Sequence, residues 1–93
     1  MSGNAVHVRI EGRVQGVWYR GWTERAAMEL GLSGWVRNRR DGSVEAVFAG
    51  ASSNIDKMVK KCYEGPPSAR VTEVITEPTT EDVQPGFKQV ATL

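Results

Sequence analysis

Residues 5–21 read AVHVRIEGRVQGVWYRG, and one hydrophobic pattern gives way to another within this stretch. Residues 5–11 alternate apolar and polar side chains, which is typical of a half-buried strand. Residues 20–30 carry apolar side chains at helical spacing, and Gly31 is placed to end that helix. The connection at 12–19 holds more glycine and more positive charge than a turn needs, so it is a candidate binding loop.

The rest of the chain repeats this alternation of strand and helix. Ser53 with Asp56 three residues later predicts a helix N-cap, and the helix that follows has a strong apolar stripe. The fourth strand alternates imperfectly, so we expect a bulge in it. The expected segments are a strand at 34–38, a hairpin turn at 39–42, a strand at 43–50, a helix from 53 to the Gly-Pro-Pro stop at 65–67, a strand at 69–77 and a short edge strand at 87–92.

The order β-α-β-β-α-β predicts an α+β, ferredoxin-like sandwich, with one mostly antiparallel sheet, two helices on one face and an extra C-terminal edge strand. Strands joined by a crossover helix run parallel, so the first and second strands should end at the same sheet edge. With one strand between them, their axes should lie about 10 Å apart. Residues 12–20 and Asn38 can therefore share a site. We expect one domain covering residues 1–93.

The amino-acid composition limits which partners and which kinds of catalytic site the chain can have. The formal net charge is +1, so any attraction for anions must be local, and nothing indicates a nucleic acid or membrane partner. The chain has one cysteine, Cys62, and one histidine, His7, which are too few for a disulfide or for a zinc site of Cys and His ligands. No segment resembles a signal peptide or a membrane span, which favours a cytoplasmic protein. We also expect no metal or cofactor, because the sequence has no cluster of ligand residues.

Glycines in a loop allow successive N–H groups to converge on an anion, and a helix N-terminus adds to the same field. Arg20 falls in the first helical turn, where a cation is unfavourable unless an oxyanion offsets it. A guanidinium can hold two phosphate oxygens at once. A solvated surface arginine is the alternative for Arg20 and the better interpretation of Arg13. The loop chemistry alone predicts a phosphate-like ligand.

Asn38 ends the second strand, and because Asp-Gly follows, it is not needed to make the turn. Its amide is a poor base, so beside a phosphoryl group it could only orient a water molecule. Without a visible metal or general acid, the leaving group must be a good one, and a carboxylate meets that requirement. An acyl phosphate fits such a site.

Two spaced motifs resemble the acylphosphatase family. Residues 12–20, GRVQGVWYR, resemble its first signature, which ends in an aromatic residue and arginine. Residues 34–44, GWVRNRRDGSV, resemble the second, and GPPSARV at 65–71 is similar to the usual lead into the fourth strand. The resemblance spans residues 5–77. It departs at the end, where Lys-Gln-Val follows Phe87, so the register of the last strand stays open.

This resemblance implies hydrolysis of acyl phosphates to carboxylate and phosphate, with inorganic phosphate or sulfate as product or competing ligand. It implies that Arg20 binds the phosphate and Asn38 orients the attacking water. It also implies that the loop supplies backbone N–H groups from Val14, Gln15, Gly16, Val17, Trp18 and Tyr19. A monomer is expected, because nothing in the sequence requires a partner.

Other side chains have plainer interpretations. Tyr19 is expected in the core, and Trp18 either rims the site or covers the surface. Gln15 could brace the loop or contact the ligand. Cys62 lies on the apolar helix stripe as a core thiol. The pair Arg39–Arg40 is expected to be solvated.

The main alternative is a non-catalytic module on the same fold that binds an anion or RNA. RNA binding on this fold uses aromatic residues on the central strands, and Phe48, the one candidate there, falls on the apolar face. A domain acting on carbamoyl phosphate within a larger protein is a further alternative, disfavoured by the short chain.

Overall fold

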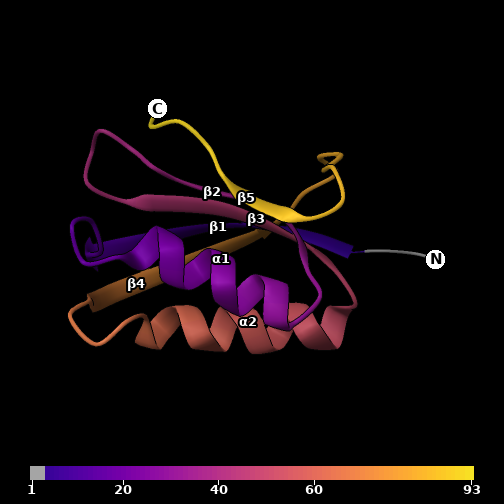
Figure 1. Cartoon of the computed structure of the whole chain (residues 1–93), viewed down its shortest axis with the longest axis horizontal. Helices are drawn as coiled ribbons and strands as arrows, with labels where there is room; N and C mark the ends of the chain where they lie inside the picture. The colour runs from indigo at the N-terminus through magenta and orange to yellow at the C-terminus, as the bar shows by residue number, and fades with distance from the viewer. Residues whose placement is uncertain (1–3) are drawn as a thin grey trace.

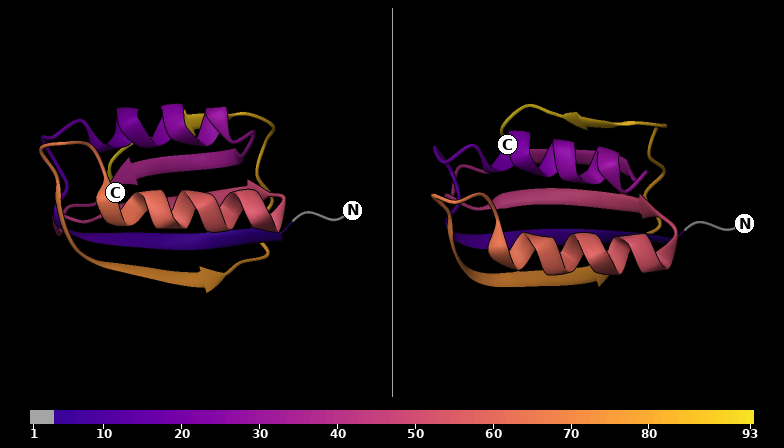
Figure 2. Two further views of the ribbon diagram at one scale, coloured as in Figure 1. Left: turned by 90° about the horizontal axis from the view of Figure 1, so that it is seen from below. Right: turned by 60° about the horizontal axis from the view of Figure 1, so that its bottom comes forward.

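The computed structural model describes residues 4–93, in which one five-stranded sheet carries both helices on the same face (Figures 1 and 2). The strands follow the order β4-β1-β3-β2-β5, and all pairs are antiparallel except β2 with β5. The ferredoxin-like fold predicted from the sequence is confirmed. The elements are β1 Asn4–Arg13, α1 Tyr19–Glu29, β2 Ser33–Asn38, β3 Val44–Gly50, α2 Ser52–Glu64, β4 Arg70–Pro78 and β5 Phe87–Gln89.

The sheet register brings the ends of β1 and β2 to one edge. Ile10 of β1 and Asn38 of β2 both pair with Val44, on opposite sides of β3. The loop after β1, the β2–β3 hairpin and the α2–β4 connection consequently gather at one end of the molecule, on the left in Figure 1. The shared edge expected from the crossover topology is confirmed.

Differences from the expected boundaries have local causes. The pairing of β1 with β4 steps from Glu11↔Glu73 to Gly12↔Val71, which leaves Thr72 as the extra residue of the expected bulge in β4. Pairing resumes beyond the bulge, and this extends β1 by two residues to Arg13. The N–H groups of Asn54 and Ile55, in the first turn of α2, donate to the carbonyl of Ala51. Ala51, and not Ser53, is therefore the N-cap of α2.

Strand β5 is an edge strand, as expected, but it ends at Gln89 instead of continuing to residue 92. Phe87 is buried and stacks on Phe48, whereas Lys88 and Gln89 are exposed. Phe87 is the one buried side chain of β5, which is otherwise held by its backbone bonds to β2 and by the hydrogen bond from Gln89 to Glu24 of α1.

Candidate anion site between the β1–α1 loop and Asn38

A pocket of about 130 Å³ lies where the loop after β1 meets the end of β2. The loop and the first turn of α1 form most of its wall, and β2 and β5 each contribute one side chain. Its lining residues are Val14, Gly16, Trp18, Tyr19, Arg20, Gly21, Asn38 and Gln89. The predicted residues Arg20 and Asn38 are thus brought together although they are 18 positions apart in the sequence.

The φ angles of residues 16–18 alternate in sign, a pattern that anion-binding nests also have. Gly16 has φ 74° and Trp18 has φ 68°, whereas Val17 between them has an ordinary negative φ. Alternation of left- and right-handed residues turns successive N–H groups toward one point. Among the backbone hydrogen bonds of turns, loops and caps in residues 4–93, none has an N–H of residues 15–18 as its donor. These donors are available to a ligand.

Trp18 is also the N-cap of α1, and its side chain does not cap the helix. A left-handed conformation costs a non-glycine residue about 1–2 kcal/mol, and such strain clusters at functional sites. The N–H groups of the first helical turn have no partner within the helix. Because Trp18 turns the chain directly into α1, the loop donors and the helix donors lie next to each other.

Arg20 lines the pocket and is half-buried. Arg37 and Arg39 both bind Glu45, at 2.8 and 3.0 Å. Arg20, in contrast, has no carboxylate within ion-pair distance among residues 4–93. A guanidinium in this position can accept an anionic partner without first giving up an internal one.

Asn38 is held by its backbone and leaves its side chain to the pocket. It pairs with Val44 in the sheet, and its carbonyl accepts a hydrogen bond of 3.1 Å from the N–H of Leu93. No side-chain hydrogen bond of Asn38 occurs in the described part of the chain. The amide can therefore donate to, or accept from, a molecule in the pocket.

Two of the predicted loop residues, Gln15 and Val17, do not line the pocket. Gln15 donates from Nε2 to the carbonyls of Arg39 and Ser43, at 2.7 and 2.8 Å, and so fastens the loop to the β2–β3 hairpin. This is the bracing role considered for Gln15, whereas ligand contact through its side chain is not supported. Val17 packs partly against the core.

Tyr19 links the start of α1 to α2. Its ring is 1% exposed, and its hydroxyl donates to the carbonyl of Cys62 at 2.5 Å. Burial raises the pKa of the Tyr19 hydroxyl above its usual range, and burial raises the pKa of the Cys62 thiol to about 12. Both groups stay protonated at neutral pH, so Cys62 is a core thiol, as expected, and not a nucleophile.

A second polar cluster lies on the sheet face away from the helices. Glu45 is 8% exposed and binds Arg37, Arg39 and His7, the last through Nε2 at 2.5 Å. Burial opposes ionisation of Glu45, yet these hydrogen bonds hold its pKa at about 2. Of the pair expected to be solvated, Arg40 is exposed, whereas Arg39 is half-buried and forms an ion pair with Glu45.

Gln89 and Gly21 line the pocket but were not predicted. Gln89 reaches the pocket because β5 pairs in parallel with β2 and so ends at the same sheet edge as Asn38, a long-range pairing that the sequence pattern does not specify. Gly21 carries no signal in the sequence pattern either. In residues 4–93 no three His, Cys, Asp or Glu side chains gather as metal ligands. No helix there is long and apolar enough to cross a membrane.

The fold and this pocket define a class, the α+β sandwiches with a glycine-containing loop and an arginine at the shared end of two parallel strands. A family model described as Acylphosphatase matches residues 6–89. An acylphosphatase from Rhodospirillum rubrum is 55% identical over 86 residues, which cover 92% of this chain and 94% of that protein. The chain belongs to the acylphosphatase family.

Solved structures agree with this assignment. An acylphosphatase from Coxiella burnetii aligns with a TM-score of 0.91 at 35% identity, covering 95% of this chain and 93% of that one. One from Bacillus subtilis aligns with a TM-score of 0.88 at 30% identity, covering 94% and 98%. The family predicted from the two motifs is confirmed, and with it the expectation of an enzyme of the hydrolase class.

Proposed function

We propose that this chain hydrolyses the carboxyl–phosphate bond of acyl phosphates, giving a carboxylate and inorganic phosphate. One observation carries the proposal: Arg20, half-buried and without a carboxylate partner, shares a small pocket with a nest of free N–H groups and with the side chain of Asn38. Family membership supports the same reaction.

The phosphoryl group is held by positive charge from two sources. Arg20 binds two of its oxygens through the planar guanidinium, and the N–H groups of the loop and the first turn of α1 bind the oxygens that face the backbone. These donors are fixed before the substrate arrives, so they stabilise developing charge without reorganising. The chain itself supplies this charge, and we propose that the reaction needs no metal ion.

Asn38 orients the attacking water. The water oxygen forms a bond to phosphorus while the bond from phosphorus to the acyl oxygen breaks, and the electron pair leaves with the carboxylate. The proton of the water passes to the phosphate product or to solvent. A carboxylate is a good leaving group, so positioning and charge stabilisation suffice for catalysis.

The test is to add purified protein to benzoyl phosphate in buffer with EDTA and follow the loss of the acyl phosphate. We expect rapid hydrolysis that inorganic phosphate inhibits competitively. Phosphate binding without turnover would instead support the non-catalytic anion-binding module. The monomeric state and cytoplasmic location expected from the sequence stay predictions.

A further inference from the structure

A groove along α1 opens from the phosphate pocket. It has a volume of about 550 Å³ and runs between α1 and β5. Its wall is formed by Trp18, Gly21, Glu24, Arg25, Met28, Glu29 and Gln89. Trp18, Gly21 and Gln89 also line the candidate anion pocket, so the two spaces adjoin.

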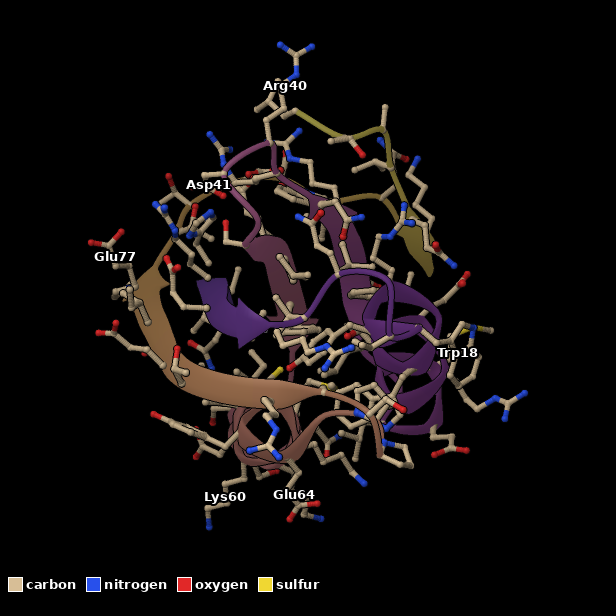
Figure 3. The ribbon with its side chains drawn as sticks, turned by 90° about the vertical axis from the view of Figure 1, so that its left-hand side faces the viewer. Trp18, Arg40, Asp41, Lys60, Glu64 and Glu77 are labelled. Carbon is tan, nitrogen blue, oxygen red and sulfur yellow. The ribbon has the colours of Figure 1, made fainter. Side chains whose placement is uncertain are left out.

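The floor of this groove is apolar and exposed. Trp18 is 59% exposed and Met28 is 62% exposed, and they are two of the few large apolar side chains that the fold leaves in solvent. Gly21 lies between them. A Cβ at Gly21 would lie 2.2 Å from the indole Nε1, so the indole of Trp18 rests directly on the helix backbone. Figure 3 shows Trp18 on the outer side of α1.

Charged side chains lie over and beside this floor. Arg25 lies over the indole of Trp18, 5.5 Å from the ring centroid, and so covers part of one face of the ring. Glu24 accepts a hydrogen bond of 2.9 Å from Nε2 of Gln89, which links α1 to β5 across the groove. An apolar ligand in the groove would therefore lie between these polar groups and would contact the part of the Trp18 ring that Arg25 leaves exposed.

We propose that this groove binds the acyl group of the substrate, and that the preferred substrates carry an extended apolar acyl chain. The inference rests on the proposed hydrolysis of acyl phosphates. In an in-line reaction the acyl group leaves opposite the attacking water. The groove provides an exit whose wall does not include Asn38. An apolar chain would also cover the exposed side chains of Trp18 and Met28, which favours binding.

The helix sets a length requirement. Met28 lies seven residues beyond Gly21, which is about 10 Å along the axis of α1. An octanoyl chain that starts in the phosphate pocket spans this distance, whereas an acetyl group ends beside Trp18 and Gly21. Met28 is therefore a specificity-determining residue for long acyl groups and does not contact short ones.

The test compares kcat/KM for acetyl phosphate and octanoyl phosphate. Full burial of one CH2 group is worth about fourfold. Because the groove is open on one side, we expect about twofold for each of the six added CH2 groups, and hence about 60-fold in favour of octanoyl phosphate. Met28→Ala should lower kcat/KM for octanoyl phosphate about fivefold and change that for acetyl phosphate less than twofold. Tyr63→Ala, which removes a similarly exposed apolar side chain from α2, should change neither.

The outcomes separate the two proposals. Equal kcat/KM values for both substrates, or equal effects of Met28→Ala on both, would overturn the acyl groove while leaving the hydrolysis intact. Hydrolysis of neither substrate would overturn the proposed function and the groove with it. Circular dichroism of Met28→Ala checks that the variant is folded, and the acetyl phosphate rate measures its active fraction.

Discussion

Ile10 of β1 and Asn38 of β2 pair with the same residue, Val44, from the two sides of β3. This register places the loop that follows β1 beside the side chain that ends β2. The proposed phosphate-holding donors and the proposed water-orienting amide thus come from separate segments that the sheet fixes relative to each other. Each part can be removed without disturbing the other, which makes their roles separable by experiment.

The Arg20 side chain is expected to hold the phosphoryl group both before and during the reaction. Arg20→Ala should therefore weaken the binding of inorganic phosphate and lower kcat/KM together, each by about 100-fold, as for loss of a bidentate charged contact. Arg20→Lys should recover little, because lysine lacks the planar fork. Isothermal titration and steady-state kinetics give the two values. Arg13→Ala, at the exposed end of β1 and outside the pocket, is the control and should leave both within about threefold.

Gly16 and Gly31 offer a matched pair for the loop backbone. Their φ angles are 74° and 67°, and a Cβ at either position meets nothing within 4 Å. Alanine should thus cost about 1 kcal/mol of stability at both positions, through backbone strain alone. Only Gly16→Ala should weaken phosphate binding, because Gly31 lies at the far end of α1. Equal phosphate affinity in the two variants would argue against a nest at residues 16–18.

Gln15 joins the binding loop to the β2–β3 hairpin through two hydrogen bonds. Gln15→Ala removes both donors, and we expect it to lower the free energy of unfolding by about 1–2 kcal/mol in urea denaturation. Gln84→Ala, in an exposed loop, should change it by less than about 0.5 kcal/mol. If the two variants were equally stable, the brace would contribute nothing to the fold.

Glu45 predicts how stability depends on pH. Its pKa of about 2 in the folded protein lies below the ordinary value of 4.5, in spite of its burial, because of its bonds to His7, Arg37 and Arg39. A depressed carboxylate pKa stabilises the fold above the unfolded value, and this contribution is lost as the pH falls from about 4.5 to 2. We expect it to reach about 2 kcal/mol. Glu45→Gln should be less stable at pH 7 and should show a smaller loss of stability over this pH range, as measured by chemical denaturation.

The sequence was sufficient for the strand order and for the meeting of Arg20 with Asn38, because alternation patterns and crossover topology determine both. It was not sufficient where long-range pairing decides the outcome. Ala51 is the N-cap of α2 because it is the one residue between the end of β3 at Gly50 and the start of α2 at Ser52. Strand β5 ends at Gln89 because Phe87 is its only side chain that reaches the core. Gln15 looked like a possible ligand contact, but its partners are hairpin carbonyls 24 and 28 positions away. The groove along α1 depends on Gln89, whose position follows from the parallel pairing of β5 with β2.

The most direct test of the central claim is to measure turnover and phosphate affinity in Asn38→Ala. The amide is proposed to orient water and not to hold phosphate. We therefore expect kcat for benzoyl phosphate to fall about 100-fold, as for the loss of one positioned hydrogen-bond donor, while the Kd for inorganic phosphate stays within about twofold. Asn54→Ala on α2 is the matched control and should change neither value. Parallel losses of turnover and phosphate affinity, or turnover equal to that of the unmodified enzyme, would contradict the proposed division of roles between Arg20 and Asn38.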